Sequence, residues 1–251
     1  MEGVLKNNDL AIICPVLNCV KYTKDFLEQV VKFINCPIII IDNASSDGTL
    51  AYLRSWEKAG NVRVMKNKVN AGVACSWNQG ILMARMRYKS KYFFIPNNDI
   101  LLQSDTIGKM LEVLKQPDIA LTSAFNVKDE IKNPRALPFA VPPLKLDLVE
   151  APDFSCFMIK GETIEKVGYF DENFYPAYFE DNDYHRRINF AGMKAVKLNT
   201  ALYYHYGSMT IKEGADIKRL SNAHYLKNED YYRKKWGGTP GKETFETPFN
   251  K

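Results

Sequence analysis

Three polar clusters in the sequence each directly follow a run of apolar residues. They are Asp-Asn-Ala-Ser-Ser-Asp-Gly-Thr at 42–49, Asn-Ala-Gly-Val-Ala-Cys-Ser-Trp-Asn-Gln-Gly at 70–80, and Asn-Asn-Asp at 97–99. Asp, Asn, Ser and Gly are the usual residues of turns and helix caps, so turn formation explains each cluster taken alone. If all three lie at one end of one sheet, their loops converge on a crevice and form a ligand-binding site.

A fourth cluster, Phe-Glu-Asp-Asn-Asp-Tyr-His-Arg-Arg at 179–187, places carboxylates next to aromatic residues. We expect a helix to begin near Glu180 and Asp181, because the exposed amides of a helix start favour carboxylates. Asp183 and Arg187 are four residues apart, so they lie on one helical face as an ion pair. The aromatic residues that precede the cluster favour a partly apolar cleft, where a carboxylate has a raised pKa and can act as a general base.

Apolar, β-branched runs alternate with amphipathic stretches through the first half of the chain. The pattern predicts strands at 10–16, 38–41, 62–65, 92–95 and 119–122. It predicts helices at 23–34, 46–58 and 73–88, and a further helix capped by Ser104. This alternation indicates βαβ units, and thus an α/β fold with a mostly parallel sheet and helices on both faces.

The regular alternation stops after Phe125. Residues 126–153 contain five prolines, so we expect an irregular loop there. Beyond it the pattern predicts a strand at 154–159, a short helix at 163–167 and extended chain at 195–206. After Gly207 we expect one or two helices, followed by a loose tail that begins near Gly237.

The composition is that of a globular protein, because 46% hydrophobic and 25% charged residues exclude wholesale disorder. No apolar run approaches the roughly 18–20 residues that a membrane span needs. The N-terminus lacks a basic segment followed by an apolar stretch, and the five cysteines show neither a disulfide framework nor a zinc pair. We therefore expect a cytoplasmic protein without a transmembrane segment.

Six motifs in order give the chain a resemblance to inverting glycosyltransferases of the GT-A fold, family 2, in the rhamnosyltransferase-like branch. The motifs lie at 14–18, 41–49, 70–81, 97–100, 167–187 and 204–208. The resemblance implies a Rossmann-like, mostly parallel sheet flanked by helices, with a C-terminal helical extension. It implies a GT-A domain at 1–206, made of a nucleotide-sugar half (1–125) and an acceptor half (126–206), followed by the extension at 207–251.

The resemblance also implies a nucleotide-sugar site in the first half of the chain. Asp42 would accept a hydrogen bond from the ring N–H of a uracil or thymine base, framed by the chain from Pro15 to Asn18. Asn98 would contact the ribose. The same site would include Asn43, Asn70, Gly72 and Asn78.

A metal site is implied where Asn97-Asn98-Asp99 stands in place of the family's D-x-D or N-x-D. Asp99 would bind Mn²⁺ or Mg²⁺ bridging the donor diphosphate, because these cations prefer carboxylate, phosphate and water oxygens. His205 is a candidate further ligand whose imidazole would favour Mn²⁺. The alternative for His205 is a hydrogen-bonded residue in an aromatic strand. Some relatives have two or three carboxylates at 97–99, so this site is expected to rely on the diphosphate oxygens.

The acceptor side of the resemblance implies that Asp181 takes the proton from the acceptor hydroxyl, with Glu180 as the fallback base. Asp183 and Arg187 would support this pair from behind. The implied reaction moves a hexose from a UDP- or dTDP-sugar to an acceptor hydroxyl, most simply on a glycan. A dinucleotide-dependent oxidoreductase is disfavoured, because no G-x-G-x-x-G follows the first strand.

Two alternatives remain open from the sequence. The same chemistry on a nucleic-acid base or a protein is less favoured: residues 207–251 hold nine Lys and Arg against six Asp and Glu, a scattered excess far below that of dedicated duplex binders. A non-catalytic module that binds a nucleotide-sugar or glycan would be expected to lack the carboxylates Asp42, Asp99 and Asp181. The extension can also mediate self-association.

Overall fold

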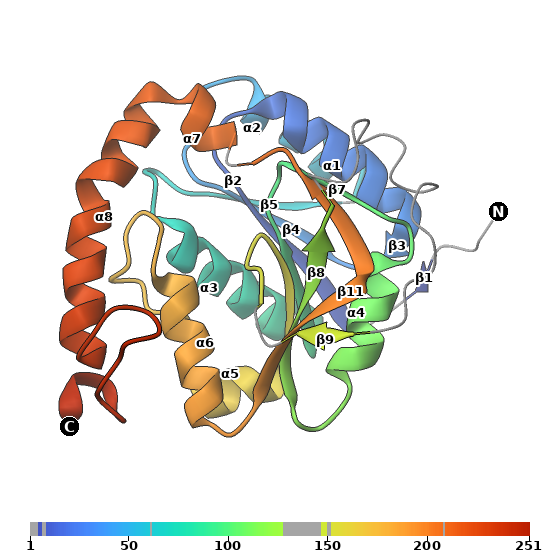
Figure 1. The fold of residues 1–251 in the computed structure, drawn as a ribbon. Coiled ribbons are helices and arrows are strands. Elements are labelled where there is room, and N and C mark those ends of the chain that lie inside the picture. The colour runs from blue at the N-terminus through green and yellow to red at the C-terminus, as the bar shows by residue number, and fades with distance from the viewer. Residues whose placement is uncertain (1–4, 7–8, 61, 128–146, 150–151, 208) are drawn as a thin grey trace.

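Most of the chain folds into regular strands and helices (Figure 1). The computed structural model describes residues 5–6, 9–60, 62–127, 147–149, 152–207 and 209–251. The strands are β1 (Leu5–Lys6), β2 (Leu10–Val16), β3 (Ile34–Asn35), β4 (Ile38–Asp42), β5 (Arg63–Lys66), β6 (Tyr92–Pro96), β7 (Ile100–Leu102), β8 (Ile119–Asn126), β9 (Leu148–Val149), β10 (Cys156–Lys160) and β11 (Lys194–His205). The helices are α1 (Val20–Phe33), α2 (Thr49–Lys58), α3 (Val73–Met83), α4 (Thr106–Leu114), α5 (Gly161–Val167), α6 (Glu180–Phe190), α7 (Met209–Glu213) and α8 (Ala215–Trp236).

One large sheet has the strand order β5-β4-β2-β6-β10-β8-β11-β7, with β9 paired to β11. The pairs β4–β5, β2–β4 and β2–β6 are parallel, so the four strands of the first half all end at the same edge. β10 lies antiparallel between β6 and β8, and β11 runs parallel to β8. The edge at which these four parallel strands end carries the loops that contain the first three polar clusters.

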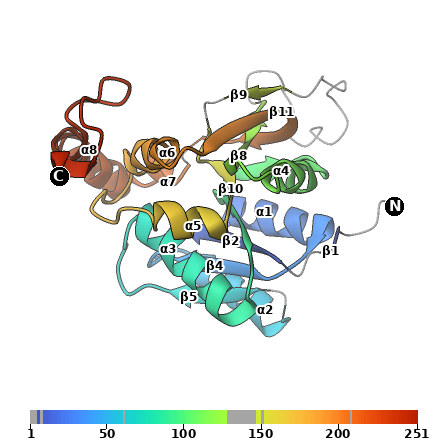
Figure 2. The same cartoon turned by 90° about the horizontal axis from the view of Figure 1, so that it is seen from below.

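Successive side chains of the buried strands pack alternately into two separate hydrophobic cores, as the two-residue period of a strand requires. Leu10, Ile12 and Cys14 of β2 belong to a core that includes residues of α1 and α4, while Ala11 and Ile13 belong to a core that includes residues of α3, α5 and α6. Figure 2 shows α1 and α4 on one side of the strands and α3 and α5 on the other. The expected coverage of both faces by helices is therefore confirmed.

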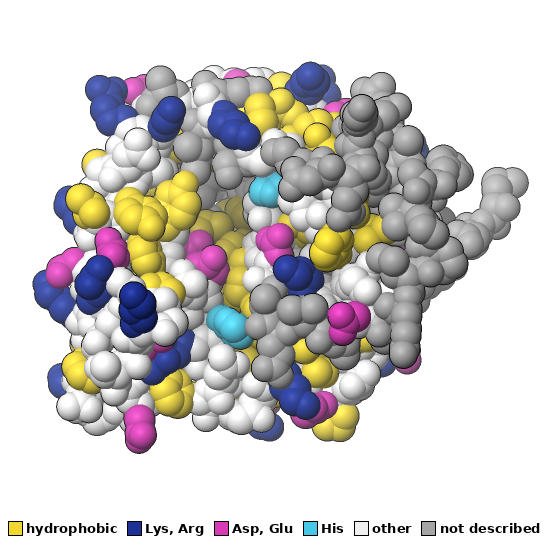
Figure 3. All heavy atoms as spheres, in the orientation of Figure 1, with side chains coloured by type: hydrophobic (Ala, Val, Ile, Leu, Met, Phe, Trp, Pro, Cys, Tyr) yellow, Lys and Arg dark blue, Asp and Glu magenta, His cyan; other side chains and the backbone are white. Residues whose placement is uncertain are grey.

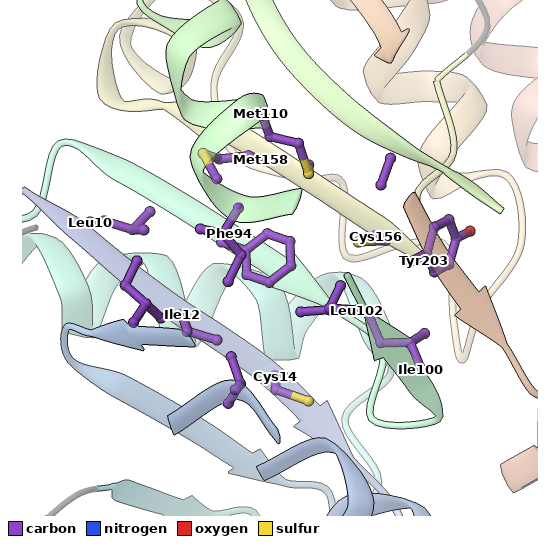
Figure 4. Close-up of a cluster of buried hydrophobic side chains, with 14 of the residues drawn as sticks. Leu10, Ile12, Cys14, Phe94, Ile100, Leu102, Met110, Cys156, Met158 and Tyr203 are labelled. Atoms are coloured by element: carbon purple, nitrogen blue, oxygen red, sulfur yellow. The ribbon is translucent and has the colours of Figure 1, made fainter. Parts of the chain in front are cut away.

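The first of these cores draws on strands that are far apart in the sequence. Figure 4 shows side chains of β2, β6, β7, β10 and β11 gathered with Met110 of α4. Phe94 and Met158 are fully buried, and they lie on neighbouring strands in register with each other. This packing fixes the ends of β6 and β10, from which the cavity-lining loops depart.

The structure differs from the sequence expectations in several details. The helix predicted at 73–88 is α3 followed by the π-helical turn η1 (Ala84–Tyr88), and the helix expected after Ser104 starts at Thr106 with Asp105 as its N-cap. β7 was not predicted. The loop predicted at 126–153 lies mostly outside the described residues.

The C-terminal tail is not loose. It turns back on the end of α8 through backbone hydrogen bonds from Thr244 and Phe245 to the carbonyl oxygen of Trp236, and ends in the 3₁₀ turn η3 (Pro248–Asn250). None of the described helices combines the length and the apolar character needed to cross a bilayer.

Candidate active site

A cavity of about 640 Å³ opens where the strand ends meet α6, α7 and α8. Figure 3 shows the hollow near the centre of this face, with acidic and histidine side chains around it. Among the predicted site residues, the cavity is lined by Pro15, Asn43, Asn70, Asn98, Asp99, Glu180 and Asp181. Asp99 and the Glu180–Asp181 pair therefore share one cavity, although they lie about eighty positions apart in the sequence.

The turn after β4 is held by Asn18, which does not itself line the cavity. Its side-chain Oδ1 accepts hydrogen bonds from the backbone N–H groups of Ser46 and Asp47, at 2.8 and 3.4 Å. Asp42 ends β4 and is fully buried, and its Oδ1 accepts a hydrogen bond from the N–H of Ser45 at 3.2 Å. Its Oδ2 is buried without a hydrogen-bond partner in the described part of the chain. An orphaned buried acceptor of this kind suits a donor group on a ligand.

Asn43 ties the second polar cluster to the first. Its Oδ1 accepts hydrogen bonds from Asn67 Nδ2 at 2.8 Å and from the N–H of Ala71 at 3.1 Å, and its Nδ2 donates to the Gly72 carbonyl at 3.3 Å. Asn70 caps the next turn by accepting from the Gly72 N–H at 3.0 Å. Gly72 has a φ of +85°, and a Cβ there would lie 3.1 Å from the Pro176 carbonyl oxygen, so its backbone packs closely against the segment that precedes α6.

The structure gives Asn78 and Asn98 different surroundings. Asn78 lies off the cavity lining and exchanges hydrogen bonds with both backbone groups of Phe170, at 2.9 and 3.0 Å, and with Glu172 at 2.8 Å. It thus connects α3 to the segment between α5 and α6. Asn98 lines the cavity, and its Nδ2 donates to Thr23 Oγ1 at 2.9 Å.

Asp99 and His205 meet although they are 106 positions apart. His205 Nε2 lies 3.1 Å from Asp99 Oδ1, because β11 pairs with β7 just after the Asn-Asn-Asp cluster. The N–H of Met209 donates to Asp99 Oδ2 at 2.9 Å. Burial works to raise the pKa of Asp99, but the hydrogen bond and charge of His205 outweigh it, and the pKa is lowered.

These two side chains fit a divalent cation as a partial ligand set. A carboxylate oxygen and an imidazole nitrogen directed at each other suit Mn²⁺ better than Mg²⁺, which prefers oxygen ligands alone. Within the described ranges no group of three or more His, Cys, Asp or Glu side chains is arranged to hold a metal ion. The remaining ligands would therefore have to come from a substrate or from water.

Glu180 and Asp181 form the first turn of α6 and face the cavity from the acceptor side. Burial raises the pKa of Asp181, and the nearby charge of Asp153 raises it further. Burial also raises the pKa of Glu180 well above its usual range, with Asp181 adding to the effect. Glu180 Oε2 is buried without a hydrogen-bond partner in the described part of the chain. This environment is suited to proton transfer.

Asp183 and Arg187 form the ion pair that their spacing predicts. Arg187 Nε and Nη2 both lie 2.9 Å from Asp183 Oδ2, and Asp183 is fully buried. Neither residue lines the cavity. Both residues follow the Glu180–Asp181 pair on α6.

Sequence reasoning missed several cavity residues, among them Trp77, Asp153, Tyr178, Lys197, Thr210 and Ser221. Asp153 accepts a hydrogen bond from the Tyr203 hydroxyl at 2.5 Å. Trp77 of α3 is buried, and its Nε1 has no hydrogen-bond partner in the described part of the chain. Lys197 stands in a strand with no motif around it, so nothing in the sequence marks it.

Solved structures with this arrangement of elements are glycosyltransferases of low sequence identity. The mannosyltransferase PcManGT from Pyrobaculum calidifontis, in complex with GDP-Man and Mn²⁺, has a TM-score of 0.60 and 17% identity, over 78% of this chain and 56% of that one. TarS (residues 1–349) from S. aureus has a TM-score of 0.59 and 14% identity, over 78% and 60%. GalNAc-T7 with UDP, GalNAc and Mn²⁺ has a TM-score of 0.61 and 13% identity, over 94% and 51%.

The chain thus spans about half to three fifths of the length of these solved proteins. No curated protein matches the sequence. The family described as glycosyl transferase family 2 matches residues 11–215, which is most of the chain. The predicted family and fold are confirmed, while the rhamnosyltransferase-like branch stays a prediction. The chain belongs to glycosyl transferase family 2 and carries a glycosyltransferase domain of the GT-A fold.

Proposed function

We propose that this chain is a metal-dependent inverting glycosyltransferase that moves a hexose from a UDP- or dTDP-linked donor to a hydroxyl group, most simply on a glycan. The observation that carries the proposal is the shared cavity, which Asp99 lines from the donor half and Asp181 from the acceptor half. Structural neighbours that hold GDP-Man with Mn²⁺, UDP-GlcNAc, or UDP with Mn²⁺ support a nucleotide-sugar donor.

On the donor side, the orphaned Oδ2 of Asp42 would accept the ring N–H of the base, and Pro15 and Asn98 would line the nucleoside pocket. Asp99 and His205 would hold the divalent cation. When bound, that cation neutralises charge on the departing nucleoside diphosphate.

On the acceptor side, Asp181 would receive the proton of the acceptor hydroxyl as its oxygen attacks the anomeric carbon. The new bond joins that oxygen to the anomeric carbon, while the bond from the anomeric carbon to the diphosphate oxygen breaks. Its raised pKa makes Asp181 a stronger proton acceptor than an ordinary aspartate. Attack opposite the leaving group in one displacement inverts the configuration at this carbon.

Donor binding can be tested by a thermal-shift panel of UDP-, dTDP- and GDP-sugars with and without Mn²⁺. We expect a UDP- or dTDP-sugar to raise the Tm only with Mn²⁺, because a ligand that binds only the folded chain stabilises it. Asp99→Ala should remove this effect together with slow Mn²⁺-dependent hydrolysis of the donor. Donor binding without any hydrolysis would favour a non-catalytic module.

The role of Asp181 can be tested with Asp181→Asn. We expect donor binding to change by less than about threefold and turnover to fall by about 10²-fold or more, the scale of losing a general base. An equal loss of donor affinity would assign Asp181 to binding instead. The anomeric configuration of the wild-type product, read by NMR, tests inversion directly.

A further inference from the structure

The turn that leads into α6 has an unusual backbone. Tyr178 and Phe179 have φ values of +81° and +74°, the left-handed region that residues other than glycine rarely adopt. Two such residues in succession persist only where surrounding contacts hold them. Glu180 and Asp181 follow immediately, so whatever holds this turn also fixes the direction of both carboxylates.

Helix α8 supplies those contacts. Asn228 is 3% exposed, and its Nδ2 donates hydrogen bonds to the carbonyl oxygens of Ala177 at 2.9 Å and Tyr178 at 3.2 Å. The Tyr225 ring centroid lies 5.5 Å from that of Tyr178 and 5.1 Å from that of Phe179. One amide side chain and one ring from α8 thus hold both residues of the strained turn.

The C-terminal end of α8 also holds the first turn of α6 through Asp183. Lys235 Nζ lies 2.7 Å from Asp183 Oδ1, and Trp236 Nε1 donates to the same oxygen at 2.9 Å. The other oxygen is occupied by Arg187. Both oxygens of a fully buried carboxylate are therefore occupied, which fixes its orientation two residues after Asp181.

Lys235 joins this contact to a second acceptor-side segment. Its side chain is 8% exposed, and its Nζ lies 2.7 Å from Asp171 Oδ2 as well as from Asp183. The Tyr231 hydroxyl, also on α8, donates to Asp171 at 3.0 Å. The two buried or half-buried carboxylates are balanced by Lys235 and Arg187. Removing Lys235 would leave negative charge uncompensated beside the first turn of α6.

The tail that follows α8 adds further contacts between α8 and α6. Gly237 has a φ of +73°, and a Cβ there would lie 2.3 Å from Thr244 Oγ1, so glycine favours this return of the chain. The tail then places Glu243 where it accepts a hydrogen bond from Tyr232 at 2.6 Å and pairs with Arg186 of α6 at 3.3 Å. Figure 1 shows α6 beside α8 along this length.

We propose that α8 is a positioning element of the acceptor site, and that Asn228 and Lys235 are positioning residues that act on Asp181 through the 178–179 turn and through Asp183. The inference rests on the proposed function, since it takes Asp181 to be the base. It deepens that function by making the C-terminal extension part of the acceptor half.

The test compares Asn228→Ala with Asn222→Ala, which removes an exposed asparagine of the same helix. We expect the Asn228 variant to lose about 10²-fold in kcat, the scale of a small misplacement of a catalytic group, with donor Kd changed by less than about threefold. Hydrogen exchange of residues 177–184 should become faster in this variant and stay unchanged in the control. Equal kcat values for both variants, or an equal loss of donor affinity, would overturn the proposal.

Lys235→Met and its exposed neighbour Lys234→Met form a second pair. We expect a loss of kcat in the Lys235 variant only, with partial recovery in Lys235→Arg, which keeps the charge. If Lys235→Met does not fold, the asparagine pair still decides the outcome. If the wild type transfers no sugar from any donor, the proposed function fails, while unchanged exchange at 177–184 in Asn228→Ala would separately refute the positioning role.

Discussion

At the scale of single residues, the cavity combines carboxylates whose surroundings drive their pKa values apart. Asp99 is held ionised beside His205, while burial favours the neutral forms of Glu180 and Asp181. Groups separated in this way can take different parts in one reaction, one binding a cation and another accepting a proton. Because the pKa values of Glu180 and Asp181 are raised, ionising these two groups lowers the stability of the fold.

Glu180→Gln should therefore stabilise the fold at neutral pH. Because the pKa of Glu180 is raised, wild-type stability falls as pH rises from about 4.3, the ordinary glutamate value, through the folded-state pKa. The glutamine of the variant does not ionise, so the variant does not lose this stability. Its Tm should exceed that of the wild type by about 2–4 °C for each kcal/mol of stability that the wild type loses. This difference should grow as the pH rises through the range in which Glu180 ionises, and it should disappear below that range. Thermal unfolding at several pH values measures this, with exposed Glu246→Gln as the control. A gain that is independent of pH would contradict the explanation.

Asp153→Asn should move the acidic limb of the kcat–pH profile to lower pH. Charge on Asp153 raises the pKa of Asp181, while His185 lowers it, so neutralising Asp153 should lower the pH at which Asp181 ionises. The asparagine oxygen can still accept from Tyr203, which limits structural change. The exposed Asp216→Asn serves as the control. An unmoved limb would mean that Asp153 does not influence the catalytic base.

At the scale of elements, the packing around β2 and β4 depends on how closely α3 approaches the sheet. Gly80 lies on the face of α3 that packs against β2 and β4. A Cβ there would lie 2.1 Å from Ile13 Cγ2 and 3.2 Å from Ile41 Cδ1. Close packing against the sheet therefore explains why the second polar cluster has glycine at position 80. The same packing brings the N-terminus of α3 to the cavity.

Gly80→Ala should destabilise the fold by about 1–3 kcal/mol, the usual range for overpacking a well-packed core. Gly48→Ala is the matched control, because no atom lies within 4 Å of the Cβ position there. We expect the control to stay within about 0.5 kcal/mol of wild type. Urea unfolding of both variants measures the difference. Equal stabilities would show that α3 can shift away from the sheet without loss.

At the scale of the whole molecule, four of the six Lys and Arg residues of α8 are paired with acidic residues. Arg219, Arg233 and Lys234 lie 2.6, 2.8 and 2.6 Å from Asp216, Glu229 and Asp230 on the same helix. Lys235 is buried against Asp171 and Asp183. Pairing with acidic side chains reduces the positive charge that these residues offer to a phosphate backbone. Self-association through 207–251 stays a prediction.

We therefore expect no retention of the protein on immobilised duplex or single-stranded DNA at about 0.15 M salt, where screening is already strong. A salt gradient from low ionic strength measures this, with the charge-reversal variant of an exposed residue, Asp230→Lys, as the comparison. Retention of the wild type at this salt concentration would revive a nucleic-acid acceptor.

Sequence patterns predicted the strands of the parallel half well, because strands covered on both faces are continuous apolar runs. β2, for example, has the predicted bounds of 10–16. The rule for strand ends predicted that the first three polar clusters converge, but it was the family resemblance that implied Asp181 in the same cavity as Asp99. The links made by Lys235 and Asn228 were not predictable, since they join positions about 50 or 60 residues apart that share no period. The left-handed pair at 178–179 was hidden as well, because neither residue is glycine.

The place of β10 in the sheet bears on how the chain emerges from the ribosome. Among the described strands, β8 pairs with β10 and β11, which are synthesised at least thirty residues later. Until β10 is synthesised, one edge of β6 and one edge of β8 have no partner strand. These edges can then pair with strands of other nascent chains. Slow translation after Asn126 would lengthen the time for which these strand edges are exposed. A holdase chaperone that binds the exposed edges would reduce their pairing with other chains during that time.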